Sequence, residues 1–161
     1  MKQSVLFTIL CCLLYGCAGS PAVTSMSNPV IAVWDLEDLS PLGITQMDLG
    51  NLLSARIMET VQQAGVYSVV EREKLEIALR ELNLGSSSLA DASTRLRIGR
   101  IAGARLMIFG AYQVIGDQMR LDLRIVEVET GRIIKTAEKT AGSGDLSEWL
   151  NAAEAAAKEL I

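Results

Sequence analysis

Residues 106–128, with the sequence LMIFGAYQVIGDQMRLDLRIVEV, contain the pattern that decides the fold of this chain. Residues 106–115 are apolar on both faces, which is typical of a strand in the centre of a sheet. Gly116 and Asp117 supply the two-residue turn of a tight hairpin. This turn predicts that the residues on its two sides pair as antiparallel strands.

The strand after the turn is expected over residues 118–128, and its side chains alternate between apolar and charged up to Ile125. Such alternation indicates one face in the core and one face in water. Val126 and Val128 are apolar in the opposite phase. We therefore expect a bulge near Ile125 or burial on both faces.

Strands and helices alternate before the hairpin. Residues 30–36 and residues 66–70 are compact apolar runs that predict buried strands. Between them, apolar residues recur at helical spacing over residues 45–64, and Gly65 stands where a helix end favours a left-handed residue. Residues 71–82 present one apolar face and predict a second helix.

A third helix precedes the hairpin. Asp91 or Ser93 is expected to cap it, and it should end near Gly103. Gly99 and Gly103 lack the spacing of a phosphate-binding loop. We interpret these glycines as positions of close helix packing.

The last strand is expected over residues 132–141, and a terminal helix follows it. Asp145 and Glu148 form a capping box at the start of this helix. Its apolar stripe is most simply part of the core, although a terminal helix is also a natural oligomer contact, with Trp149 as a candidate interface residue. The stripe consists of Leu146, Trp149, Leu150, Ala153, Ala157 and Leu160.

These elements predict an α/β fold with the order β-α-β-α-α-β-β-β-α and a mixed sheet of about five strands. Two strand-helix-strand crossovers imply parallel pairing among the first three strands, with right-handed connections. The last three strands form an antiparallel meander, and the helices pack on the sheet. We expect residues 30–161 to form one domain, because a chain of this length buries about 70% of its unfolded surface.

Residues 1–16 resemble an export signal. A positive residue, Lys2, precedes an apolar run that is shorter than the roughly 20 residues of a membrane-spanning helix. The run ends in Leu14-Tyr15-Gly16-Cys17, which is typical of a bacterial lipoprotein signal. We expect Cys17 to become the lipidated first residue of the mature protein.

The residues after Cys17 predict where the domain works. Several acyl chains on one cysteine anchor a protein far more firmly than a single chain does. Ala18 occupies the position where Asp would signal retention at the inner membrane in enteric bacteria, so we expect the periplasmic side of the outer membrane. Residues 17–29 are rich in Ser, Ala, Gly and Pro and predict a short flexible tether, about 40 Å when fully extended.

Composition excludes several kinds of chemistry. The chain has 15 basic and 19 acidic residues, so a nucleic-acid partner is not expected. It contains no histidine, which excludes His-dependent nucleophiles and His-containing zinc sites. The three cysteines lie in the signal or at the lipidation position. We therefore expect no enzyme activity, no cofactor and no small-molecule substrate.

An acidic cluster follows the first predicted strand. Asp35, Glu37 and Asp38 stand where a glycosidase-like acid pair or a calcium site would be conceivable. A solvated acidic loop is the simpler interpretation.

Arginines cluster on or beside the third predicted helix, at Arg95, Arg97, Arg100 and Arg105. They form a solvated helix face or meet lipid phosphates or an acidic partner. Pairing of Arg97 and Arg100 with the acidic loop 37–40, which contains Glu37 and Asp38, on a neighbouring subunit would make a head-to-tail ring.

Four segments resemble the lipoprotein family of the curli secretion channel, known as CsgG-like. They are VIAVWDLED (30–38), VVEREKLEIALRELNLG (69–85), IGRIAGARLMIFGAY (98–112) and RLDLRIVEVETGRII (120–134). Related domains occur in a flagellar outer-membrane lipoprotein, in a lipoprotein activator of a peptidoglycan synthase and at the amino end of the periplasmic Tol propeller protein. The resemblance implies a domain that binds other envelope proteins and catalyses nothing.

The chain departs from the pore-forming relatives, which carry long hairpins inserted beside the equivalent strands. Here residues 116–117 form only a two-residue turn, and residues 142–144 lead directly into the final helix. We therefore expect an outer-membrane-anchored accessory for assembly or export of a surface structure, without a pore of its own. The alternative is an activator of a cell-wall synthase, which the short tether disfavours because the synthase lies in the opposite membrane.

Overall fold

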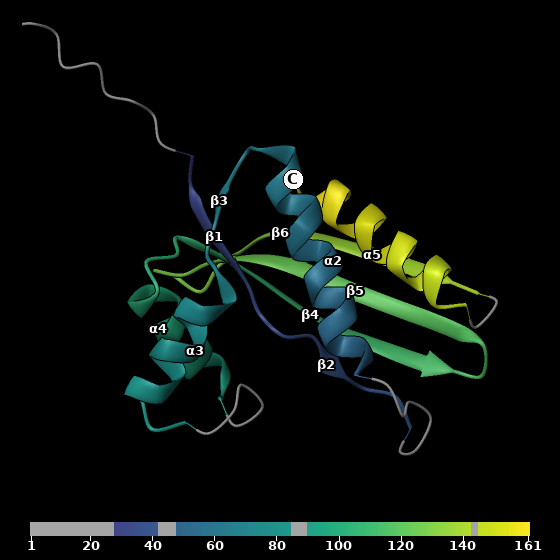
Figure 1. Ribbon diagram of the computed structural model, residues 1–161, viewed down its shortest axis with the longest axis horizontal. Helices are drawn as coiled ribbons and strands as arrows, with labels where there is room; N and C mark the ends of the chain where they lie inside the picture. The colour runs from purple at the N-terminus through teal and green to yellow at the C-terminus, as the bar shows by residue number, and fades with distance from the viewer. Residues whose placement is uncertain (1–27, 42–47, 85–89, 143–144) are drawn as a thin grey trace, which may run out of the picture.

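The computed structural model describes residues 28–41, 48–84, 90–142 and 145–161 (Figure 1). Within these ranges the chain forms a mixed α/β fold with a six-stranded sheet. The strands are β1 (Val30–Val33), β2 (Glu37–Asp38), β3 (Ser68–Val69), β4 (Leu106–Ile115), β5 (Gln118–Glu127) and β6 (Ile133–Ala141). The helices are α2 (Leu49–Ala64), α3 (Arg72–Glu81), α4 (Ala92–Ile101) and α5 (Leu146–Leu160). The predicted fold class and element order are confirmed, with β2 as an additional short strand.

The sheet has the strand order β3-β1-β4-β5-β6, and β2 pairs with β4 beyond the end of β1. Strand β1 pairs parallel with both β3 and β4, as the two crossovers predict. Strands β4, β5 and β6 form the expected antiparallel meander. The expected strand over residues 66–70 is shorter than predicted, because Val66 is 51% exposed and lies outside the ladder.

The first predicted strand is interrupted. Ile31 pairs with Leu106 whereas Glu37 pairs with Ala111, so one extra residue lies between β1 and β2. Across this interruption Trp34 and Leu36 are both buried, and they point into different core clusters. The bulge thus lets one apolar run fill both faces of the sheet.

Both interpretations of the β5 pattern are correct. The pairing of β5 with β6 shifts between Ile125 and Val126, so a bulge exists, but the extra residue is Ile134 on β6. The pairing of β5 with β4 is regular through this region. Val126 is apolar because it is buried on the second face of the sheet, beneath α4.

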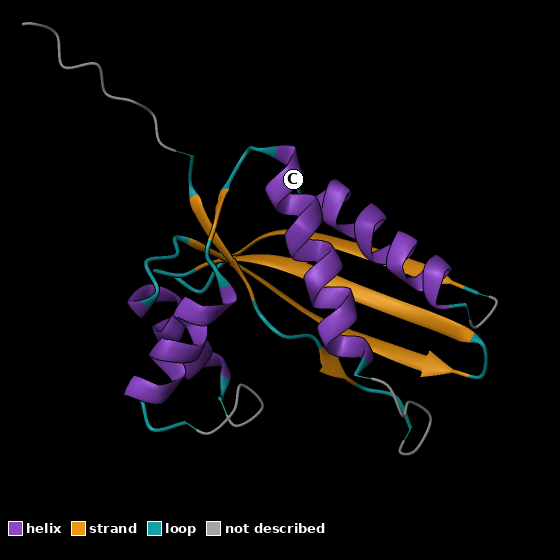
Figure 2. Ribbon diagram, in the orientation of Figure 1, coloured by secondary structure: helices purple, strands orange, loops and turns teal. Residues whose placement is uncertain are grey.

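The helices cover the two faces unequally. Helices α2 and α5 contact each other and lie side by side over one face of the sheet, whereas α3 and α4 lie at the end opposite the β4–β5 turn (Figure 1, Figure 2). One core cluster joins α2, α5 and the facing side chains of the sheet. A second, smaller cluster joins α3 and α4 to the opposite face. Among the described residues, no helix covers that opposite face over the hairpin half of the sheet.

Local side-chain chemistry sets the helix ends. Helix α2 begins at Leu49, with the Asp48 carboxylate accepting from the Asn51 amide, and the residues before Asp48 lie outside the described part of the chain. The predicted cap of α4 by Asp91 is confirmed, since its carboxylate accepts from the Thr94 amide at 2.7 Å. Asp145 caps α5 through the Ser147 amide at 2.9 Å.

Gly99 and Gly103 serve different purposes. A Cβ on Gly99 would lie 2.2 Å from the Met107 sulfur, so this glycine permits close helix packing as predicted. Gly103 has a φ of 81°, and no described atom lies near the place of its Cβ. The packing interpretation is therefore wrong for Gly103, which provides the left-handed turn after α4.

Buried Ser54 on α2 links that helix to the chain between β1 and β2. Its hydroxyl donates to the Gly50 carbonyl at 2.7 Å and accepts from the Leu36 amide at 3.2 Å. Ser54→Ala leaves the buried Leu36 amide without its acceptor, so we expect a loss of about 1–3 kcal/mol in the free energy of unfolding. Urea denaturation measures this loss.

Thr60→Val is the matched control for Ser54→Ala. Thr60 is also buried on α2, but its hydroxyl donates only to the Arg56 carbonyl one turn earlier. No buried amide depends on it for an acceptor, so we expect a loss below about 1 kcal/mol. Equal losses in the two variants would show that the Leu36 hydrogen bond does not set the cost.

Candidate functional site

The half of the sheet that carries no helix presents side chains from three strands to solvent. On β5 these are Arg120, Asp122 and Arg124, which alternate with the buried residues of the main core. On β4 the same face begins with Phe109, which is 6% exposed and packs in the second core cluster. A cavity opens where the first turn of α4 meets the strands.

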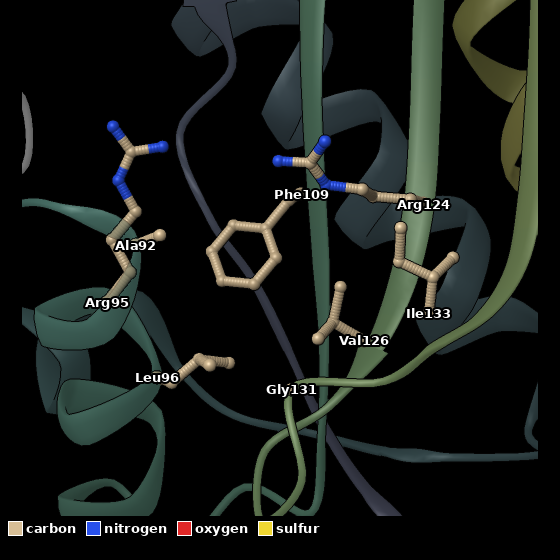
Figure 3. A pocket seen from close by; sticks show the side chains of 8 residues that line it. All are labelled: Ala92, Arg95, Leu96, Phe109, Arg124, Val126, Gly131 and Ile133. Carbon is tan, nitrogen blue, oxygen red and sulfur yellow. The ribbon is translucent and has the colours of Figure 1, made fainter.

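This cavity has a volume of about 170 Å³ and an apolar lining (Figure 3). The first turn of α4 forms one wall, and side chains from β4, β5 and β6 form the other. In Figure 3 the guanidinium groups of Arg95 and Arg124 lie on either side of Phe109 at the same end of the pocket. The lining residues are Ala92, Arg95, Leu96, Phe109, Arg124, Val126, Gly131 and Ile133.

A second cavity of about 630 Å³ continues along the same face. It shares four lining residues with the first: Arg95, Phe109, Arg124 and Ile133. It extends over β5 and β6 and is also bounded by the exposed Leu39, which follows β2. We call the two cavities together the sheet groove, defined by the residues that line them.

Most charges in the sheet groove are paired within the chain. Arg95 forms an ion pair with Glu37 of β2. Arg120 binds both oxygens of Asp122 at 2.9 Å and also contacts Glu138 at 3.0 Å.

Arg124 differs from these neighbours. Among the residues that the structure describes, no carboxylate forms an ion pair with Arg124. The nearest acid on its own strand face, Asp122, has both oxygens bound by Arg120. The apolar pocket therefore has an uncompensated positive charge at its mouth.

The structure separates the three carboxylates of the predicted acidic cluster. Asp35 pairs with Arg72 of α3, and Glu37 pairs with Arg95 of α4. Asp38 accepts from the Ser40 amide at 2.8 Å and also bonds the Tyr112 hydroxyl. No group of acids in the described ranges has the arrangement of a metal site. Glu37 and Asp38 form strand β2 instead of the expected acidic loop, and the three carboxylates contact α3, α4 and β4.

The other predicted interface residues lie at separate places. Arg97 and Arg100 are exposed on α4, and the Arg100 guanidinium approaches the Val128 carbonyl at 3.5 Å. Trp149 is half-buried and packs against the main core. Glu37 forms an ion pair with Arg95 of its own chain, and the pairing of Arg97 and Arg100 with the 37–40 segment of a neighbour stays a prediction. Cys17 and Ala18 lie outside the described residues.

Tyr112 is the titratable group that the fold perturbs most clearly. Burial, followed by the hydrogen bond to Asp38, raises its pKa above the ordinary value of 10.0. The folded protein keeps this phenol protonated at pH values where the unfolded chain ionises it. The resulting stability is complete below about pH 10 and decreases as the pH rises further.

Tyr112→Phe removes this alkaline sensitivity. We expect the urea midpoint of the wild-type protein to fall more steeply than that of the variant as the pH rises from about 9 to 11. Lysines and arginines also affect how the urea midpoint depends on pH. Because they are the same in both proteins, their contribution cancels in the comparison. Parallel curves would contradict the raised pKa of Tyr112.

Sequence patterns indicate part of the sheet groove but do not identify it. The alternation on β5 places Arg124 on the solvated face, and nothing in the pattern separates it from Arg120. The pocket depends on Ile133, which the β6 bulge places opposite Val126, and on the position of α4. In the described part of the chain, no helix has both the length and the apolar character needed to cross a membrane.

Comparison with known proteins shows where this fold occurs. A family model described as "curli production assembly/transport component CsgG" matches residues 20–115. A search of curated proteins finds no significant sequence match.

Solved structures share the fold at low sequence identity. The LpoB C-terminal domain from Escherichia coli aligns with a TM-score of 0.62 and 15% identity, over 84% of this chain and 94% of that chain. The corresponding domain from Salmonella enterica aligns with a TM-score of 0.61 and 18% identity, over 76% of this chain and 88% of that chain. A chain of a PelC dodecamer from Paraburkholderia phytofirmans aligns with a TM-score of 0.57 and 13% identity, over 83% of this chain and 88% of that chain. Because the family model covers more than half of the sequence, the chain belongs to the family of curli production assembly/transport component CsgG.

Proposed function

We propose that this protein is a non-catalytic lipoprotein of the bacterial envelope that assists assembly or export of a surface structure through protein contacts at the sheet groove. The observation that carries the proposal is the groove itself. It combines an apolar pocket, exposed apolar side chains such as Ile133 at 53%, and Arg124, for which the described residues supply no ion-pair partner, on a face that no described helix covers. Concave apolar surfaces with a few polar groups are typical binding sites.

The charged groups of the groove support binding more than catalysis. Its carboxylates are held in ion pairs with arginines and a lysine, as for Glu37, Glu138 and Glu159. A general acid or base must instead meet substrate and exchange a proton near neutral pH. The absence of histidine from the chain agrees with this proposal.

The short hairpin supports an accessory without a pore of its own. Ile115 pairs directly with Gln118, so the β4–β5 connection is a two-residue turn. One face of both strands is covered by α2 and α5, and it carries the main core. Strands used in this way hold the domain together.

A regulator of a cell-wall synthase is the second candidate, favoured by the fold shared with the LpoB domains. The tether between Cys17 and β1 gives a reason to rank it lower. Twelve residues span at most about 40 Å, which restricts the domain to the neighbourhood of its own membrane. A measured interaction with a synthase from the opposite membrane would reverse this order.

The proposed function is tested by replacing two apolar side chains of similar exposure, one inside the sheet groove and one outside it. Ile133→Glu places a charge in the sheet groove, and Val66→Glu places one elsewhere at a side chain that is 51% exposed. We expect native gels of solubilised envelopes to show a large complex for wild type and Val66→Glu, and its loss for Ile133→Glu. A complex that survives Ile133→Glu would contradict a role for the groove.

Lipidation at Cys17 is tested separately. Cys17→Ser removes the thiol that would be acylated, so we expect no palmitate incorporation and a shift from the membrane fraction to the soluble periplasmic fraction. Ala18→Asp keeps the cysteine and should keep the palmitate label. A Cys17→Ser protein that stays in the membrane fraction would show that something other than Cys17 holds it there.

A further inference from the structure

We propose that the β4–β5 turn of a second copy of this chain occupies the sheet groove, with Ile115 in the apolar pocket and Asp117 beside Arg124. The inference deepens the proposed function by naming the partner at the same surface. It depends on the chemistry of the pocket and on where the matching groups lie elsewhere on the chain.

The pocket selects an apolar group next to a carboxylate. Its volume of about 170 Å³ resembles that of cavities of ~150 Å³ that hold a benzene ring, so it accepts a branched aliphatic side chain. At its mouth Arg95 is already paired with Glu37, which leaves the Arg124 charge to be neutralised. Arginine pairs well with carboxylates.

The β4–β5 turn presents this combination. Ile115 is the most exposed of the large apolar side chains in the described residues, at 61%. Asp117 follows two residues later in the turn and is exposed. Gly116 between them has a φ of 63°, so the turn is tight and both side chains lie at the tip of the hairpin.

The turn cannot reach the pocket of its own chain. Phe109 of the pocket and Ile115 are six residues apart on the continuous strand β4, which corresponds to roughly 20 Å. A β4–β5 turn that occupies the pocket must therefore belong to another copy. Ile115 lies on the same sheet face as Phe109, because side chains two residues apart share a face.

This common face favours a two-fold arrangement. Two copies placed face to face, with their strands reversed, bring each turn to the other copy's pocket at the same time. Such isologous dimers are the commonest form of homo-oligomer. The contact uses the sheet face opposite the main core, with Glu159 of α5 at the edge of the groove.

A charge exchange tests the contact. In the full-length lipidated protein in detergent solution, Asp117→Arg and Arg124→Asp should each weaken the dimer at least about tenfold, because each creates a like-charge pair at both contacts. The double variant restores the opposite charges and should regain most of the affinity. Sedimentation velocity gives the dissociation constants, and Arg97→Asp, on α4 outside the groove, is the control.

Disulfide crosslinking is a second test. It introduces no charge, so its outcome does not depend on how a charge substitution affects folding. Ile115→Cys with Ile133→Cys places two thiols too far apart for a disulfide within one chain, since bridged Cα atoms lie within about 7 Å. We expect the double variant to form a disulfide-linked dimer, more efficiently than either single variant.

Three results would overturn the proposal: a monomeric wild type, single variants that dimerise like wild type, or a double variant no better than the singles. Loss of the dimer only in Arg97→Asp would assign the contact to the arginines of α4 instead. If Ile133→Glu abolishes an envelope complex while the wild-type protein alone is monomeric, the proposed function holds and this inference fails.

Discussion

Leu121→Ala is expected to lower the free energy of unfolding by about 2–5 kcal/mol. Leu121 is fully buried at the centre of β5, between Tyr112 on β4 and Lys139 on β6. It belongs to the core cluster that joins the sheet to α2 and α5. Removing its side chain leaves a cavity between the sheet and the α2–α5 layer, and the helices cannot collapse into it without breaking other contacts.

The matched control is Leu52→Ala on α2. Leu52 carries the same side chain but is 39% exposed, and alanine is the better helix former at this position. We expect a change below about 1 kcal/mol. Urea denaturation followed by tryptophan fluorescence measures both variants. Similar losses at the two positions would mean that β5 does not lie at the centre of the core.

Gly110→Ala is expected to cost about 1–3 kcal/mol, although it adds only one methyl group. A Cβ at Gly110 would lie 2.5 Å from a methyl carbon of Leu123 and 2.7 Å from the backbone oxygen of Asp122. The Leu36 side chain is also only 2.7 Å away. Side chains can rotate to relieve such contacts, but the Asp122 oxygen belongs to the backbone of β5, so the sheet itself must shift.

Gly142→Ala provides the comparison. No described atom lies within 4 Å of the place where its Cβ would be. We expect this substitution to leave the urea midpoint nearly unchanged, because it neither creates a clash nor removes a contact. If Gly110→Ala also left the urea midpoint unchanged, that result would contradict the close approach of β4, β5 and Leu36.

The β4–β5 hairpin illustrates what local sequence determines. Its first strand and its turn agree with prediction to the residue, and its second strand ends one residue earlier than expected. Period-two alternation and a Gly-Asp turn depend on neighbouring residues only. The same is true of the Asp91 cap, which needs an amide three residues away.

The first strand illustrates what local sequence leaves open. The run from Val30 to Leu36 looks continuous because every residue but Asp35 is apolar. Its interruption follows from tertiary contacts, since the Leu36 amide bonds Ser54 of α2 instead of joining the β4 ladder. The same interruption explains the additional strand β2, because the chain pairs with β4 again after the bulge.

The candidate site combines both cases. The alternation of β5 predicts that Arg124 faces water, and this is confirmed by its exposure. The pocket beside it arises where α4 meets the β4–β5 hairpin and the segment from Gly131 to the β6 bulge, which are far apart in the sequence. Glu37 pairs with Arg95 of its own chain, a contact between β2 and α4 that no local pattern predicts, whereas pairing of Arg97 and Arg100 with a neighbouring subunit stays a prediction. Long-range packing decides each of these points.

The central claim is that the sheet groove is the surface through which this protein contacts other proteins. Site-specific photocrosslinking in living cells tests it most directly, with a benzophenone amino acid at Ile133 in the groove and, in a second strain, at Val66 outside it. We predict a crosslinked adduct from position 133 and none from position 66. No adduct from position 133, or equal adducts from both positions, would contradict the claim.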